Sequence, residues 1–214
     1  MSGEPEGSRS GISSRLGGLV RGMGDYLYSL FDLGDLKEIS RRYAVTNIFD
    51  SVLMMLGIIL GSYSTGVSEP SIVVGLISAG ALSIFLSGSI GTYISERAER
   101  ELKIKELERA VLMALEETVI SKLERGKAVI IALMSGGVPS IVVMLLSLPF
   151  HLCRYGILEI KHSYMSSVAE ALALLFIMGT YLGSLSGRNR IIYALSTLGA
   201  GILLVVVTIW LGVK

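Results

Sequence analysis

NIFDSVLMMLGIILG, residues 47–61, is apolar throughout except for Asn47, Asp50 and Ser51. A carboxylate at the centre of a transmembrane helix costs about 2.5–3.5 kcal/mol on insertion scales, and such a residue usually serves a function. Asp50 is therefore the first candidate functional residue of the chain, provided that the run around it spans a membrane.

The composition supports a membrane setting. Of the 214 residues, 51% are hydrophobic and 17% are charged, and the mean hydropathy is +0.65. Soluble domains carry about 25% charged residues, so we expect a polytopic membrane protein. The net charge of +1 gives no sign of nucleic-acid binding. Cys153 is the sole cysteine, which excludes an internal disulfide and a metal site built on cysteines.

Five segments are long enough to cross a membrane. A hydrocarbon core about 30 Å thick requires about 20 apolar residues of helix. The qualifying segments are about 44–64, 71–94, 128–150, 165–185 and 191–212. Their runs are continuous rather than alternating, which excludes a β-barrel. We predict an all-α integral membrane protein with five transmembrane helices and a cytoplasmic helical hairpin between the second and third.

The remaining segments complete the predicted organisation. Residues 1–21 are polar and rich in Gly and Ser, as expected of a disordered tail. Residues 22–42 form a juxtamembrane segment, either an amphipathic helix on the membrane surface or a loosely ordered linker. The first two transmembrane helices lie within 43–94, the acidic hairpin within 95–126, and the last three helices within 127–214.

Lys and Arg predict the orientation. Six precede the first span, eight lie in 95–127 and two lie between the fourth and fifth spans, whereas the opposite side has three: Arg154, Lys161 and Lys214. The richer side is cytoplasmic by the positive-inside rule. The N-terminus is then inside and the C-terminus outside, in the cell membrane if the source is prokaryotic.

Small residues recur at a spacing that places them on one helix face. Gly57 and Gly61 in the first span, and Gly179 and Gly183 in the fourth, are separated by four positions. Such faces allow helix backbones to approach closely in lipid. The contact can be packing within one chain or a seam between two copies.

Residues 93–125 contain no Gly or Pro and favour helix. The second span is expected to continue as helix into this region. Carboxylates and a thioether here suit Fe²⁺ or Mn²⁺, and the candidate ligands are Glu96, Glu99, Glu106, Met113, Glu116 and Glu117. The alternative is a solvated hairpin, because three Glu-to-base pairs have i,i+4 spacing: Glu96–Arg100, Glu99–Lys103 and Glu101–Lys105.

Four stretches resemble the vacuolar iron transporter family of divalent-metal transporters. Asp50 is followed by glycines at +7 and +11, with Val45 upstream, as in that family's first span. GTYISERAERE, 91–101, is similar to its GEYxSxxxxRE motif. The other two stretches are SGGVPSIVVMLLSLPF, 135–150, and GSLSGRNRIIYALSTLGAGILLVVVTIWLG, 183–212. The resemblance covers about residues 41–213.

The resemblance implies a five-helix homodimer that exchanges Fe²⁺ or Mn²⁺ for protons along a path between subunits. It implies that Asp50 binds both the metal ion and the proton. By position alone, the family's cytoplasmic metal ligands correspond to Glu96, Glu99, Glu106, Glu116 and Glu117. The chain departs from the family at Ser51, where glycine is usual, at Thr92, where the motif has glutamate, and at Gly88, where methionine is expected. Its cytoplasmic segment is also shorter.

The predicted function is therefore proton-coupled export of Fe²⁺ or Mn²⁺, with no permanently bound cofactor. The transport path comprises Asp50, Asn47, Met54, Gly57 and Gly61, where Met54 can supply the thioether. Glu170 is a candidate proton relay, or a group at the headgroup level.

A second hypothesis is a membrane scaffold or sensor whose acidic hairpin binds a partner. An enzyme is not expected, since the sequence has no Ser-His-Asp set and no phosphate-binding loop.

Overall fold

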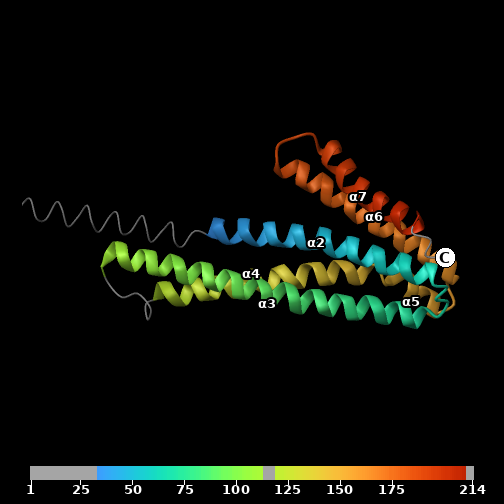
Figure 1. Ribbon diagram of the computed structural model, residues 1–214, viewed down its shortest axis with the longest axis horizontal. Coiled ribbons are helices and arrows are strands. Elements are labelled where there is room, and N and C mark those ends of the chain that lie inside the picture. The colour runs from blue at the N-terminus through green and yellow to red at the C-terminus, as the bar shows by residue number, and fades with distance from the viewer. Residues whose placement is uncertain (1–32, 113–118, 211–214) are drawn as a thin grey trace, which may run out of the picture. The chain divides into compact units, whose positions relative to one another are not determined.

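The computed structural model of the chain describes residues 33–112 and 119–210. Every regular element in these ranges is a helix (Figure 1). The helices are α2 (Leu33–Ser64), α3 (Pro70–Val111), α4 (Val119–Leu145), α5 (Leu148–Arg154), α6 (Ile160–Leu185) and α7 (Arg190–Trp210). All except α5 are long and apolar enough to cross a membrane. The prediction of an all-α protein with five membrane-length helices is confirmed.

The chain divides into two compact units, residues 1–38 and 39–214. The described part of the first unit, residues 33–38, is helical and belongs to the beginning of α2. The predicted tail at 1–21 and most of the juxtamembrane segment lie outside the described residues. All contacts discussed below lie within the second unit.

The helix ends agree with local sequence signals. Pro70 begins α3, a position where its missing N–H costs no helical hydrogen bond. From there α3 continues without interruption to Val111, so the predicted continuation of the second span as helix is observed. Leu112 adopts a left-handed conformation with φ of 55° and ends α3.

The third span differs from the predicted segment 128–150. α4 ends at Leu145, and the separate helix α5 begins at Leu148. Pro149 explains the break, because it has no N–H to donate to the carbonyl of Leu145 and its ring crowds that carbonyl. The Ser147 hydroxyl donates to the Met144 carbonyl at 2.7 Å and satisfies one acceptor at the end of α4.

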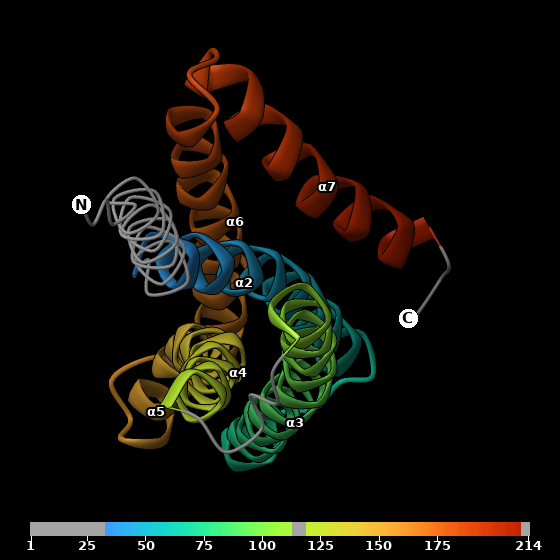
Figure 2. The same cartoon turned by 90° about the vertical axis from the view of Figure 1, so that its left-hand side faces the viewer.

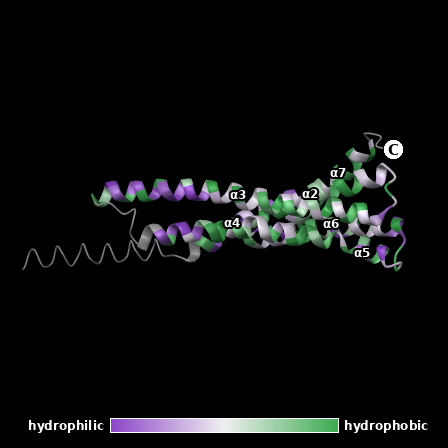
Figure 3. Cartoon of the chain, turned by 90° about the horizontal axis from the view of Figure 1, so that it is seen from below, coloured by the Kyte–Doolittle hydropathy of each residue, from purple (hydrophilic) through white to green (hydrophobic). Residues whose placement is uncertain are grey.

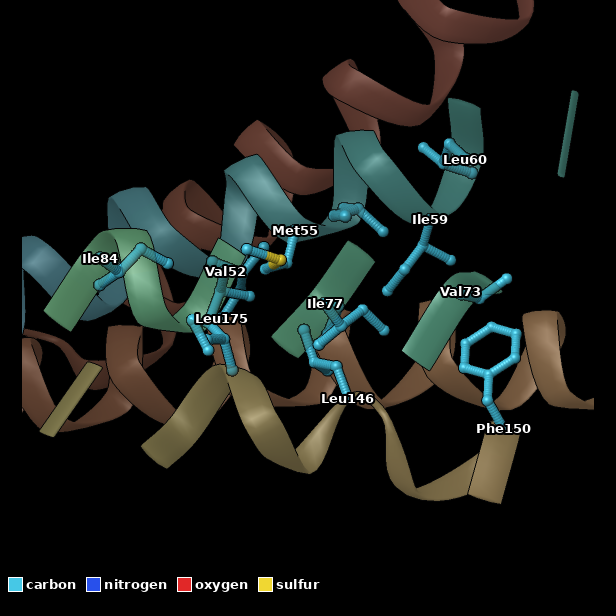
Figure 4. Close-up of a cluster of buried hydrophobic side chains, with 14 of the residues drawn as sticks. Val52, Met55, Ile59, Leu60, Val73, Ile77, Ile84, Leu146, Phe150 and Leu175 are labelled. Atoms are coloured by element: carbon cyan, nitrogen blue, oxygen red, sulfur yellow. The ribbon is translucent and has the colours of Figure 1, made fainter. Parts of the chain in front are cut away.

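An apolar core joins α2, α3, α5 and α6. Figure 4 shows Met55 and Ile59 of α2 close to Ile77 of α3, with Phe150 of α5 and Leu175 of α6 in the same cluster. All five side chains are fully buried. Dispersion between closely packed side chains holds such a core, because lipid supplies little hydrophobic driving force between helices.

Two helix pairs approach closely through glycine, α3 with α4 and α6 with α7. Figure 2 shows α6 and α7 next to each other at the end where they are connected, from which α7 diverges. A Cβ atom built on Gly88 would lie 2.9 Å from the Cα of Gly136 on α4. One built on Gly179 would lie 2.5 Å from the Cα of Ala194 on α7. Glycine is required at both positions, since real Cβ atoms essentially never come so near a backbone atom.

Polar residues are unevenly distributed along α3 and α4. Figure 3 shows hydrophilic residues gathered on the C-terminal part of α3 and the first turns of α4. The N-terminal part of α3 and the C-terminal part of α4 are apolar. The membrane-length portion of α3 is thus followed by a charged extension of the same helix.

Candidate functional site

A groove of about 380 Å³ lies between α2 and α3 and contains Asp50. Its other lining residues are Tyr43, Asn47 and Ser51 from α2, and Ile84, Ser87, Gly88, Gly91 and Thr92 from α3. On each helix these residues recur every three or four positions, so each helix contributes one face. Asp50 is an exposed residue of the chain and is the acidic residue of this groove.

Asn47 is held in place by α4. Its Nδ2 donates to the Ser135 carbonyl at 3.0 Å and to the Ser135 hydroxyl at 2.7 Å. In a regular helix that carbonyl would accept from the N–H of residue 139, but residue 139 is proline. Asn47 therefore satisfies a carbonyl that Pro139 leaves without its helical donor.

The same contact includes α3. The hydroxyl oxygens of Thr92 and Ser135 are 2.7 Å apart and share a hydrogen bond. Ser135 thereby connects α2, α3 and α4 at the inner wall of the groove. Hydrogen bonds that connect three helices through one residue help to fix the relative positions of those helices.

The geometry also fixes the orientation of the Asn47 amide. A backbone carbonyl only accepts hydrogen bonds, so the nitrogen of the amide must face the Ser135 carbonyl. The oxygen, Oδ1, is then the atom with which this side chain can accept a hydrogen bond or bind a cation, and Asn47 lines the groove together with Asp50.

The remaining predicted path residues continue the exposed face of α2. Met54 is 45% exposed, and a Cβ atom on Gly57 or Gly61 would meet nothing within 4 Å. With Asp50 they occupy positions i, i+4, i+7 and i+11, which share one side of a helix. This face is open in the protomer, and Met54 is not among the residues that line the groove.

A buried ion cluster lies between α3 and α4. Glu96, Arg100, Glu124 and Lys127 are all buried. Arg100 contacts Glu96 at 3.3 Å and also contacts Glu124, whose other oxygen lies 2.7 Å from Nζ of Lys127. The expected Glu96–Arg100 pair is thus present, and the charge of Glu96 is neutralised by a neighbouring base.

Exposed charges on α3 form a different arrangement. Glu101 accepts a hydrogen bond from Arg97 at 2.9 Å, rather than forming the expected pair with Lys105. This hydrogen bond lowers the pKa of Glu101 below its ordinary value. Glu99 and Glu106 are likewise exposed on α3.

The other predicted ligands are not brought together by the described structure. Met113, Glu116 and Glu117 lie outside the described residues. Within 33–112 and 119–210, no three His, Cys, Asp or Glu side chains are grouped closely enough to hold a metal ion. Glu170 is partly buried on α6 and does not line the Asp50 groove.

Reasoning from sequence did not place five polar residues at the groove: Tyr43, Ser51, Ser87 and Thr92, which line it, and Ser135, which contacts Asn47. Pro139 was the available signal for Ser135. A proline inside an apolar helix leaves the carbonyl four residues earlier without its donor, and in lipid some neighbour must supply one.

Comparisons with known proteins add one distant relative. The chain is 27% identical over 158 residues to a protein of Methanocaldococcus jannaschii that is described as uncharacterized. The match covers 72% of this chain and 79% of that protein. No protein-family profile matches the chain, and no solved structure matches it.

Proposed function

We propose that this protein transports a divalent metal ion, Fe²⁺ or Mn²⁺, out of the cytoplasm in exchange for protons. The ion passes between two copies of the chain, with the N-terminus cytoplasmic and the C-terminus outside. The resemblance to vacuolar iron transporters supports this function, and the main observation behind it is the position of Asp50 in the groove. An exposed carboxylate in a polar groove of a membrane-length helix is costly unless an ion uses it.

The open face of α2 supports a path between copies. Met54, Gly57 and Gly61 follow Asp50 along one side of the helix, and the two glycines leave room for another backbone. A second copy placed on this face would bring two Asp50 carboxylates near a common axis. Two like charges at close range strengthen the affinity of the pair for a cation or a proton.

Coupling follows from the use of one group by both ions. A carboxylate that binds a metal ion cannot hold a proton at the same oxygen. A proton arriving from outside releases the metal, and a metal arriving from the cytoplasm displaces the proton. Acidic side chains exposed on α3, such as Glu99 and Glu106, raise the local cation concentration near the entrance.

The test is flux in proteoliposomes. Vesicles containing purified protein and a metal-sensitive dye are given a pH gradient and external Fe²⁺ or Mn²⁺. We expect gradient-dependent entry by wild type, loss of entry in Asp50→Asn, and normal entry in Glu69→Gln. Glu69 is an exposed carboxylate next to the N-terminus of α3 and outside the groove, so it controls for the loss of one acidic group. Wild-type flux in Asp50→Asn would refute the proposal.

The second candidate function is a membrane scaffold or sensor that binds a partner through the charged extension of α3. The buried ion cluster favours it, because Glu96 and Glu124 are already neutralised by Arg100 and Lys127. If this second function is correct, the folded wild-type protein transports no metal ion in the flux assay. Replacing exposed charges of α3 would then abolish partner binding while leaving the fold intact.

A further inference from the structure

We infer that the cation site at Asp50 is built from oxygen atoms alone and selects hard divalent ions such as Mn²⁺ over thiophilic ions such as Cd²⁺. This inference rests on the proposed transport function and specifies the chemistry of its site. It assigns ligand roles to Asn47 and Ser87 beside Asp50, and it excludes Met54 as a ligand.

The donors of the groove support this chemistry. Asp50, Asn47 and Ser87 all line the groove and offer a carboxylate, an amide oxygen and a hydroxyl oxygen. The Ser87 hydroxyl donates to the Ile84 carbonyl at 3.4 Å, which leaves its oxygen lone pairs for a cation. The lining residues, all of which lie in the described ranges, include no Met, Cys or His. Carboxylate, carbonyl and hydroxyl oxygens suit Mg²⁺, Ca²⁺ and Mn²⁺, whereas thioether and thiolate favour softer ions.

Neither methionine of this part of α2 lines the groove. Met55 is fully buried, and its side chain packs against Gly80 of α3, where a Cβ atom would contact its terminal methyl group. Met54 lies on the exposed face one turn beyond Asp50, which is about 6 Å further along the helix axis. Met54 is thus displaced from the carboxylate along the path, toward the small-residue positions Gly57 and Gly61.

The amide of Asn47 is prepared for this role. Its nitrogen donates to Ser135, which leaves Oδ1 as the atom with which Asn47 can bind a cation. A ligand whose orientation is fixed by a second hydrogen bond binds its metal more tightly than a freely rotating one. The carbonyl left free by Pro139 thereby determines which atom of Asn47 faces the ion.

The experiment introduces a thiol at two matched positions of α3 and removes the thioether of Met54 on α2. Mn²⁺ flux into proteoliposomes is measured with increasing Cd²⁺ as competitor, for wild type, Ser87→Cys, Ser83→Cys and Met54→Leu. Ser83 is exposed one turn before Ser87 on α3 and does not line the groove. All variants keep Cys153, which lies on α5.

We expect Cd²⁺ to inhibit Ser87→Cys at a concentration at least tenfold lower than wild type. Ser83→Cys and Met54→Leu should have the wild-type inhibition constant. A changed Cd²⁺-to-Mn²⁺ preference in Met54→Leu, or equal sensitisation by the two cysteines, would overturn the inference while Asp50-dependent flux preserved the proposed function. Absence of Mn²⁺ and Fe²⁺ flux from folded wild type would overturn both.

Discussion

Gly57 and Gly61 of α2 share their four-residue spacing with Gly179 and Gly183 of α6, but the surroundings of the two pairs differ. A Cβ atom on Gly179 would lie 2.5 Å from the Cα of Ala194, and one on Gly183 would lie 2.6 Å from the Cα of Arg190. On Gly57 or Gly61 it would meet nothing within 4 Å. The α6 pair is occupied by α7, whereas the α2 pair faces outward from the protomer.

The difference shows what such spacing can and cannot indicate. Small residues four positions apart allow close backbone approach in lipid, but the spacing does not specify the partner. In this chain it serves packing within one copy at α6. At α2 it adjoins Asp50 and meets nothing within 4 Å, and only the proposed function places a second copy there.

The largest expected effect is at the occupied pair. Gly179→Leu should destabilise the protomer by about 3 kcal/mol or more, because the added side chain has to displace the backbone of α7. The loss is measured by heating the protein in detergent to a series of temperatures and determining the fraction that remains folded by size-exclusion chromatography. Gly57→Leu is the matched control and, at protein concentrations in detergent where both variants are monomeric, should unfold at the wild-type temperature. Equal destabilisation by both substitutions would remove the distinction between the two pairs.

A smaller but still clear effect is expected between α3 and α4. A Cβ atom on Gly136 would lie 2.7 Å from the backbone nitrogen of Ser89, whereas one on Gly137 would meet nothing within 4 Å. Gly136→Ala should therefore cost about 1–3 kcal/mol. Gly137→Ala should be neutral or gain up to about 1 kcal/mol from helix propensity. Denaturant titrations followed by circular dichroism compare these neighbouring positions, and reversed signs would contradict the close approach of the helices.

Self-association tests the open pair. Gly57→Leu should weaken dimerisation in liposomes by about tenfold or more, equivalent to about 1.4 kcal/mol, because the side chain blocks the approach of a second α2 helix. Energy transfer between labelled copies measures the effect. Gly75→Leu, at another open position but on α3, provides the control. Identical association of both variants would place the seam on a different face.

The smallest effect is expected at an intermediate position. A Cβ atom on Gly80 would contact the end of the flexible Met55 side chain, with the sulfur at 3.2 Å, rather than any backbone atom. Met55 can rotate away at a cost of order 0.5–1.5 kcal/mol, which the helix propensity of alanine partly offsets. Gly80→Ala should therefore change the free energy of unfolding by less than about 1 kcal/mol. A loss as large as that of Gly136→Ala would show that Met55 cannot move.

Much of the fold followed from local sequence. The length of the apolar segments predicted the five membrane-length helices. A segment in lipid has to satisfy its backbone hydrogen bonds internally, and a helix does so. Pro70 indicated the beginning of α3. The break before α5 was missed although Pro149 signalled it, since the apolar run continues through that position and hydropathy alone does not register a missing donor.

The candidate site was predicted less completely, because its contacts connect distant parts of the chain. The Glu96–Arg100 pair followed from i,i+4 spacing on one helix. The second partner of Arg100, Glu124, belongs to another helix and has no local signal in the sequence. Asp50 was identified by its cost in an apolar run, but Ser87 and Thr92 join the groove only because α3 packs against that face of α2.

The hydrogen bond from Asn47 to the Ser135 carbonyl has a mechanical consequence. Sliding α2 along α4 would expose a carbonyl that has lost its helical donor to Pro139. An unsatisfied buried group costs about 1–3 kcal/mol, and the Thr92–Ser135 contact adds α3 to the same unit. The three helices therefore favour moving as one rigid body. Under the proposed transport between two copies, alternating exposure of Asp50 to the two sides would then arise from rotation of one copy against the other, with the hydrogen bonds at Ser135 unchanged within each copy.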